Sequence, residues 1–340
     1  MNDVRSLLTG PRGRDFVAAV ASRCSNAVRP ALYEAARNPH DEDAVRALAR
    51  ALSDVDLRCL SGLSVLEVYE ALAESVADAR YWQEPFEEDQ VLASPRLDGI
   101  LDPIGERVLS HEAAGAWEGG LSTQQWYVQW SDNPRPHLVG ARQTLAKWHR
   151  DVVEEEARAL RERPADPRAN WSGFWWSIPP RVLPSTSPGH DWLGATDLIL
   201  TEDEQCWEQA TIWPMQPSGP VRVFEIATAA DWVHLVEAAP VDVSRSRLHD
   251  WYRATGHVGN WFIPNWLQIS DRYDAIHLKV TGYLETAGRF LPVGSGGTVL
   301  AGWKPGATYW LTDCLVITGQ AARWERKSSN GANRRWQPVT

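Results

Sequence analysis

Three polar segments in the second half of the chain carry side chains that could do chemistry. The first is the segment 181–187, which follows an aromatic stretch and ends in three hydroxyl residues, Ser185, Thr186 and Ser187. Hydroxyl groups beyond the end of a strand can orient a polar ligand, so we expect these residues to bind one. The alternative is an ordinary turn, because Ser and Thr beside Pro184 and Pro188 are typical turn residues.

The second segment, residues 249–266, is dense in ionisable and aromatic side chains. We expect its rings to bind a ligand and its cation to serve catalysis: Trp251, Tyr252, His257, Trp261 and Trp266, with Arg253. Loops held on a rigid scaffold carry binding and catalytic groups more often than cores do. The alternative is a small aromatic cluster that only packs a long loop.

The third segment, residues 273–285, contains a histidine that could act as an acid or a base. On a strand, His277 shares a face with Ala275 and not with Asp274, so it is not simply paired with that carboxylate. If this face lines a cleft, His277 could transfer a proton. The alternative is a hydrogen-bonded histidine of the core.

Together the segments predict an enzyme with an aromatic cleft for a nucleotide-like or aromatic small molecule. Trp rings and an arginine would hold this ligand, and a carboxylate would stabilise developing charge. The candidate catalytic residues are then His277, Glu285 and Arg253. This hypothesis requires Ser185, Arg253 and His277 to lie around one pocket. The alternative is a non-enzymatic module that binds a ligand or a protein through an exposed patch of Trp, Tyr and Arg.

Tryptophan divides the chain into two parts. Seventeen of its 19 tryptophans lie after residue 120, and each one buries a large ring while its N–H needs a partner. The strand-like runs that contain Trp171, Trp175, Trp176, Trp303 and Trp310 predict core positions for these rings. Core packing explains the three tryptophans of the second segment less well, because that segment is polar and contains glycine. A third possibility is that most of the rings are simply core.

The charge balance disfavours nucleic acid as a partner. The chain has 34 Lys and Arg against 44 Asp and Glu, a formal net charge of −10, whereas binding to phosphates needs clustered cations. A basic cluster near the C-terminus comprises Arg323, Arg326, Lys327, Arg334 and Arg335. We expect it to be a solvated tail. The sequence does not predict an oligomeric state.

The cysteines and the hydropathy suggest a cytoplasmic protein. Cys24, Cys59, Cys206 and Cys314 are far apart in the sequence, which is typical of buried, reduced thiols. The first residues contain no apolar stretch of signal length, and no run is long enough to span a membrane. We therefore expect no membrane association.

Several well-defined catalytic motifs are missing from the sequence. It has no phosphate-binding Gly-rich loop ending in Gly-Lys-Ser/Thr, no dinucleotide fingerprint, no Gly-x-Ser-x-Gly and no His-Glu-x-x-His. The glycine-rich run 294–297 lies between two strand-like runs and predicts a hairpin turn. His249, Asp250 and His257 come closest to a set of metal ligands. Chance recurrence explains this spacing equally well, so we expect no metal site.

The predicted elements indicate an α+β fold in three parts. Residues 1–118 show helical periodicity, with a capping box of Ser64 and Glu67. Residues 119–326 predict a Trp-rich mixed or antiparallel sheet domain with short helices, and residues 327–340 a mobile polar tail. The expected strands cover residues 126–130, 171–179, 221–226, 275–280, 298–303 and 308–311, and the expected helices cover 142–163 and a segment capped by Thr228 with Asp231.

Much of the chain resembles a group of Trp-rich proteins from high-GC bacteria. The runs that carry this resemblance are Leu8–Arg14, Ala79–Pro85, His249–Arg253, Tyr273–Leu278 and Gly302–Leu311. This likeness implies no particular activity.

The hydroxyl run at residues 185–187 is also similar to the Ser-Thr-Ser strand of ADP-ribosyltransferase folds. That resemblance implies NAD as a cofactor and transfer of its ADP-ribosyl group. It further implies an upstream arginine, such as Arg135 or Arg150, and a downstream glutamate, for which Glu225 and Glu285 are the candidates.

Overall fold

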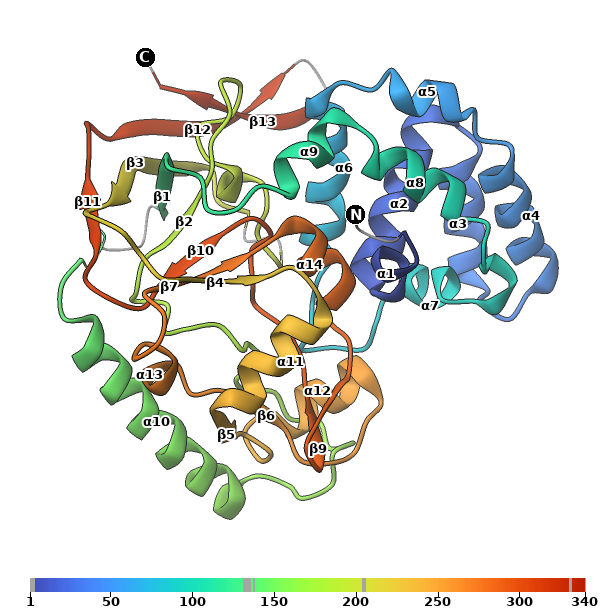
Figure 1. Ribbon diagram of the computed structural model, residues 1–340. Coiled ribbons are helices and arrows are strands. Elements are labelled where there is room, and N and C mark those ends of the chain that lie inside the picture. Colours follow the sequence, from blue (N-terminus) through green and yellow to red (C-terminus); the bar gives the residue numbers. More distant parts are fainter. Residues whose placement is uncertain (1–3, 131–135, 137, 204–205, 330–331, 340) are drawn as a thin grey trace.

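The computed structural model shows an α+β fold in which helices precede a mixed sheet (Figure 1). It describes residues 4–130, 136, 138–203, 206–329 and 332–339. In Figure 1 the N-terminal helices lie to the right of the sheet, and helices α10 to α13 lie below it. The predicted fold class is therefore confirmed.

The first part of the chain is helical, as predicted. Ser64 and Glu67 form the expected capping box at the start of α6, since the Ser64 N–H donates to the Glu67 carboxylate at 2.8 Å. The helices are α1 (Val4–Thr9), α2 (Pro11–Cys24), α3 (Val28–Arg37), α4 (Glu42–Ser53), α5 (Leu57–Ser61), α6 (Val65–Ala77), α7 (Glu87–Leu92), α8 (Asp102–Leu109) and α9 (Glu112–Trp117), with a 3₁₀ turn at Pro95–Leu97.

The sheet has the strand order β13-β12-β3-β1-β2-β10-β7-β4, and β11 also pairs with β3. Only β4 and β7 pair in parallel among the described strands. These strands are β1 (Gln125–Trp130), β2 (Ser185–Ser187), β3 (Gln209–Pro217), β4 (Val223–Ile226), β7 (Ala275–Leu278), β10 (Thr308–Trp310), β11 (Leu315–Ile317), β12 (Ala322–Ser329) and β13 (Ala332–Pro338).

Two small hairpins and several helices complete this part. The hairpins pair β5 (Pro240–Asp242) with β6 (Phe262–Pro264), and β8 (Leu291–Val293) with β9 (Gly296–Thr298). The helices are α10 (Ala141–Glu162), α11 (Ala229–Ala238), α12 (Leu248–Thr255), α13 (Trp266–Ile269) and α14 (Val280–Thr286), with a 3₁₀ turn at Thr196–Leu198. The predicted cap of Thr228 with Asp231, the long helix and the hairpin turn at residues 294–297 are confirmed.

Three predicted elements are wrong. Residues 171–179 are not a strand: the run is irregular and is held by single bonds such as that from the Ser177 N–H to the Ala301 carbonyl, at 2.8 Å. The strand expected over 298–303 stops at Thr298, where the small hairpin ends. The segment expected as a mobile tail instead forms most of the β12–β13 hairpin, because β12 extends the main sheet by pairing with β3.

The prediction of core positions holds for Trp303 and Trp310 but is wrong for the tryptophans of residues 171–176, and the tryptophans of the 249–266 segment are buried. Nine of the seventeen after residue 120 are buried, seven are half-buried and Trp171 alone is exposed, at 39%. Trp251, Trp261 and Trp266 are fully buried, and the Trp251 indole donates to the Trp175 carbonyl at 2.7 Å. The rings of the polar segment are therefore core, as are Trp303 and Trp310, whereas those of residues 171–176 lie nearer the surface.

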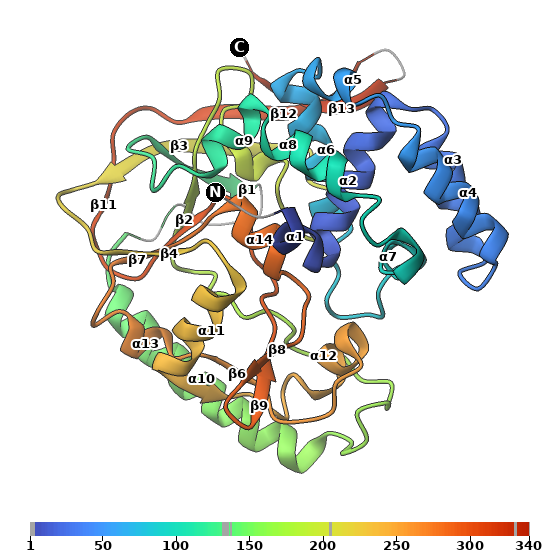
Figure 2. The same cartoon turned by 45° about the vertical axis from the view of Figure 1, so that its right-hand side comes forward.

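The helical and sheet parts meet where the turn between α1 and α2 presses on α14 (Figure 2). A Cβ atom at Gly10 would clash with the Leu284 carbonyl and lie 2.7 Å from the carbonyl oxygen of Glu285. Arg12, 1% exposed, pairs with Asp89 and donates to the Ser75 carbonyl at 2.8 Å. One hydrophobic cluster runs through both parts.

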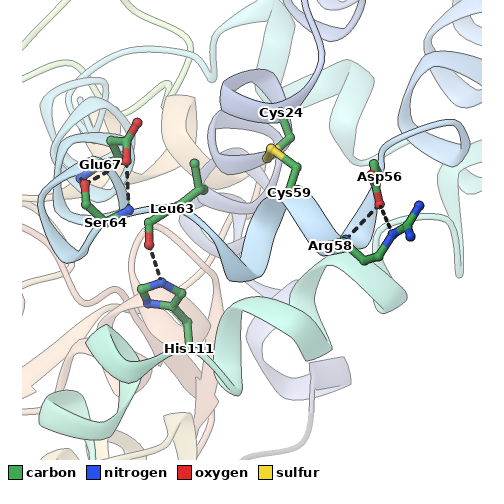
Figure 3. Close-up of a disulfide and its surroundings, with 8 residues drawn as sticks. All are labelled: Cys24, Asp56, Arg58, Cys59, Leu63, Ser64, Glu67 and His111. Carbon is green, nitrogen blue, oxygen red and sulfur yellow. Dashed lines mark hydrogen bonds and ion pairs between the residues drawn. A yellow bond between two sulfur atoms is a disulfide. The ribbon is translucent and has the colours of Figure 1, made fainter.

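Two of the cysteines are joined, contrary to the expectation of reduced thiols. Cys24 at the end of α2 and Cys59 in α5 form a disulfide, with their Cα atoms 5.8 Å apart (Figure 3). Sequence spacing could not show this, because the packing of two helices brings together residues that are 35 positions apart. The pairing also removes the cysteine-based argument for a reducing compartment. Within the described ranges, no helix is both long and apolar enough to cross a membrane.

Gly10→Ala is expected to lower the free energy of unfolding by about 2–3 kcal/mol, because the added methyl group overpacks a contact with backbone. Urea denaturation measures this change. Gly115→Ala is the matched control: it lies in α9 with open space around its Cβ position, and we expect it to be neutral or stabilising by up to about 1 kcal/mol. Equal effects of the two substitutions would contradict the close contact.

Replacing both Cys24 and Cys59 by Ser is expected to cost about 3–4 kcal/mol, because the unfolded chain regains the freedom of a loop of this length. Thermal denaturation with and without a reductant measures the loss. The reductant should lower the melting temperature of the wild type and leave that of the double variant unchanged. A wild type that is insensitive to the reductant would show that the disulfide does not stabilise the fold.

Candidate functional site

A groove of about 660 Å³ lies between helix α6 and the β12–β13 hairpin. This volume falls in the range of roughly 300–1,000 Å³ that is typical of small-molecule sites. Four tryptophans from distant parts of the chain line the groove: Trp130, Trp192, Trp207 and Trp336. The chain therefore has an aromatic groove, but residues other than the predicted ones form it.

Ring stacking builds the aromatic side of the groove. Trp130 and Trp207 stack with centroids 4.2 Å apart and planes at 18°, and Trp336 lies 5.7 Å from Trp130. Trp192 stacks on His190 at 5.0 Å. Because Trp192 and Trp207 are only half-buried, their remaining surface is available to a ligand.

The hairpin and the end of β1 place these rings by strand alternation. Trp336 is the direct cross-strand neighbour of Arg326, so both side chains lie on the same face of the hairpin. Two of the groove rings, Trp130 and Trp336, also belong to a second hydrophobic cluster. This cluster includes Trp324 and residues of β3 and of the segment 193–198. The groove is thus built on a packed support.

Two arginines and two glutamates supply the charge of the groove. Arg326 and Arg335 come from the hairpin, and Glu70 and Glu74 come from α6. Arg335 pairs with Glu70 at 2.8 Å and so connects the hairpin to the helix. Glu74 pairs with two arginines of the helical part. The lining carboxylates are therefore neutralised by partners.

The predicted hydroxyl run lies in the middle of the sheet, and all three hydroxyls are bonded within the chain. Thr186 Oγ1 donates to Gln125 at 2.7 Å and accepts from the Trp310 indole at 2.7 Å. Ser187 Oγ accepts the N–H of Asp197. Ligand binding by these residues stays a prediction, and it would require each hydroxyl to exchange its present hydrogen bond for one to the ligand.

Ser185 differs from its two neighbours because it lies beside an amine. Lys304 Nζ donates to Ser185 Oγ at 3.0 Å and pairs with the buried Asp197 at 2.6 Å. The amine therefore bridges the Ser185 hydroxyl and the buried Asp197 carboxylate. This arrangement supports a structural role for the pair.

His277 lies two strands from the hydroxyl run. Its Nδ1 is 3.0 Å from Thr308 Oγ1, and Thr308 in turn pairs with Thr186 across the sheet. Burial lowers the pKa of His277 to about 4, although Glu225 opposes the shift. The imidazole is thus neutral near pH 7. Glu285 instead accepts the N–H of Ala229 at the start of α11.

The 249–266 segment lies apart from these strands. Helix α12 is separated from β2 and β7 in both views (Figures 1 and 2). Arg253 donates to the carbonyls of Trp82 and Trp171 and pairs with Asp250. Arg168 lies over the ring of Tyr252, and His257 stacks on Phe290 at 3.9 Å.

Two of the three predicted segments are therefore brought together and the third is not. Ser185 on β2 and His277 on β7 are separated only by strand β10, whereas Arg253 anchors a loop elsewhere. None of the predicted site residues lines the groove in the part of the chain that the structure describes. Of the residues suggested by the ADP-ribosyltransferase likeness, Glu225 pairs with Lys279 at 3.1 Å, Arg150 is exposed on α10, and Arg135 lies outside the described residues.

Sequence reasoning missed the groove because its residues are far apart in the sequence. Trp336 and two of the basic residues were placed in or beside an expected tail, and Trp192 and Trp207 lie in irregular segments. Glu202, the first acid of a Glu-Asp-Glu run, was also passed over, and its side chain is buried. No set of three His, Cys, Asp or Glu side chains among the described residues could hold a metal ion.

Comparison of the chain with protein-family models, curated proteins and solved structures finds no match.

The neutral state of His277 predicts a pH-dependent stability. Its pKa is lowered from 6.5 to about 4, so its contribution is present above pH 6.5 and is lost as the pH falls towards 4. Between these limits the wild type should lose roughly 3 kcal/mol more than His277→Gln. Denaturation curves at pH 7 and pH 4 measure the difference. Identical losses would contradict the buried, neutral imidazole.

Proposed function

We propose that this protein binds a small molecule with a flat ring, of the nucleotide-like kind, in the groove between α6 and the β12–β13 hairpin. The observation that carries the proposal is the lining of a groove of about 660 Å³ by four tryptophans and two arginines. The ring of such a ligand would meet the tryptophans of this lining, and its anionic group would meet the arginines.

The rings supply the main attraction. Trp130 covers one face of Trp207, and Trp207 lines the groove while half-buried. A ligand base that stacks on such a ring gains about 1–3 kcal/mol, and stacking tolerates different bases. The groove therefore favours a flat aromatic group over an aliphatic one.

The arginines supply a place for an anionic group. The Arg335 side chain is 53% exposed and shares its charge with Glu70, so a phosphate could compete for the guanidinium. Arginine forms bidentate bonds with phosphates. NAD and nucleoside phosphates combine a flat ring with phosphate and are the ligands to test first.

Binding is the function that the groove supports best. Its two carboxylates are paired with arginines, so neither could act on a ligand without breaking an ion pair. ADP-ribosyl transfer is a second candidate, supported by the likeness of the Ser185–Ser187 run. It would require NAD to reach strand β2 as well as the groove.

The test is a thermal-shift and fluorescence titration with ATP and NAD. A ligand at about 100 times its dissociation constant stabilises the native state by about 2.7 kcal/mol, so the melting temperature should rise by a few degrees. Trp207→Ala should weaken binding by roughly five- to a hundredfold, because it removes the stacking surface.

Trp171→Ala is the matched control, since Trp171 is the most exposed of the C-terminal tryptophans and does not line the groove. We expect it to bind ATP like the wild type. Equal loss in both variants, or no shift with either nucleotide, would contradict the proposal.

A further inference from the structure

A buried carboxyl group lies beside one wall of the groove. Leu198, Ile199 and Thr201 line the groove, and we call the segment 198–203 that contains them the wall. The next side chain, Glu202, is only 5% exposed. Its Oε2 accepts a hydrogen bond of 2.6 Å from the N–H of Gly302. Glu202 therefore ties the wall to the sheet part of the protein.

The same wall is tied to the helical part by the next residue. The Asp203 N–H donates to the carbonyl of Ala79 at 3.1 Å, and the Asp203 carboxylate pairs with Arg80 at 3.4 Å. Within the wall, the Leu200 N–H donates to the Thr196 carbonyl at 3.0 Å. Exchange of the Asp203 and Leu200 amide protons with solvent therefore reports whether the wall is in place.

The surroundings of Glu202 favour its neutral form. The titratable groups that face it are Tyr81, Tyr283 on α14, Tyr309 on β10 and the guanidinium of Arg12 on α2. Glu202 Oε1 and the hydroxyls of Tyr81 and Tyr283 are buried, and the Tyr283 hydroxyl interacts with both Tyr81 and Glu202. Burial raises the pKa of Glu202 to about 8, although the Gly302 N–H and Arg12 oppose the shift.

We propose that Glu202 is a positioning residue for the groove, whose neutral carboxyl holds the wall of residues 198–203 in place and whose proton, once lost to solvent, releases it. The inference rests on the groove being the ligand site proposed above. It makes occupancy of the groove depend on pH through a group that does not touch the ligand.

The direction of the pH dependence follows from the raised pKa. When the wall is released, Glu202 reaches water and regains its ordinary pKa near 4.5. The wall is therefore held most firmly below pH 4.5, is released more often as the pH rises to about 8, and changes no further above that. A purely structural role would give no such profile.

Hydrogen exchange of the Leu200 and Asp203 amides, corrected for the intrinsic rate, tests this from pH 5 to 9.5. In the wild type the frequency of opening should rise roughly tenfold per pH unit up to about pH 8 and then level off. Glu202→Gln keeps the shape and an acceptor without the charge, so its profile should be flat. Asp191→Asn removes an exposed acid that is not among the groups facing Glu202, and it should keep the wild-type profile.

A second variant covers the case in which Glu202→Gln fails to fold. Tyr283→Phe keeps the Glu202 carboxyl but removes a hydroxyl that lowers the pKa of that carboxyl. The pH at which the frequency of opening levels off should therefore rise. A flat wild-type profile, or an unchanged slope in Glu202→Gln, would overturn the proposal.

Titration with ATP separates this proposal from the proposed function. Affinity should weaken between pH 5 and 8 more in the wild type than in Glu202→Gln, and this comparison removes the titration of ATP itself. Exchange is read without any ligand, so absence of ATP binding with the expected exchange profile would contradict only the ligand site. Equal pH dependence of affinity in both proteins would contradict the link between Glu202 and the groove.

Discussion

The approach of Gly10 to the backbone of α14 is the contact on which the arrangement of the two parts depends. No other residue type leaves room there for the carbonyls of Leu284 and Glu285. The buried Arg12 lies two residues further on and extends the contact to Asp89 and Ser75. Because α2 packs against α6, the same contact also helps to position the helix that lines one side of the groove.

Local patterns in the sequence predicted the elements that depend on local physics. Helical periodicity and the caps at Ser64 and Thr228 gave helices where the structure has them, and alternation gave β1, β4 and β10. The prediction of a strand over residues 171–179 is wrong because a run that is apolar on both faces has no period that distinguishes a strand from a packed irregular segment. The C-terminal hairpin was not predicted because its pairing with β3 is a tertiary contact that its polar composition does not reveal.

The sequence could predict that an aromatic site exists, but not which residues form it. The density of tryptophan correctly suggested an aromatic groove, but burial and not local polarity decides which rings are free to bind. Trp251 and Trp261 lie among charged residues in the sequence, yet both are fully buried, and Arg253 and Asp250 pair beside them. The groove joins rings from β1, β13 and two irregular segments, and no linear spacing connects these.

We expect the tryptophans of the groove, and not those of the core, to contact the ligand. Indole N–H resonances report on each tryptophan separately, so an NMR titration with ATP distinguishes the two sets. The resonances of Trp207, Trp192 and Trp336 should shift, while those of Trp251 and Trp266 should stay in place. Shifts confined to the core tryptophans, with the groove resonances unchanged, would contradict this expectation.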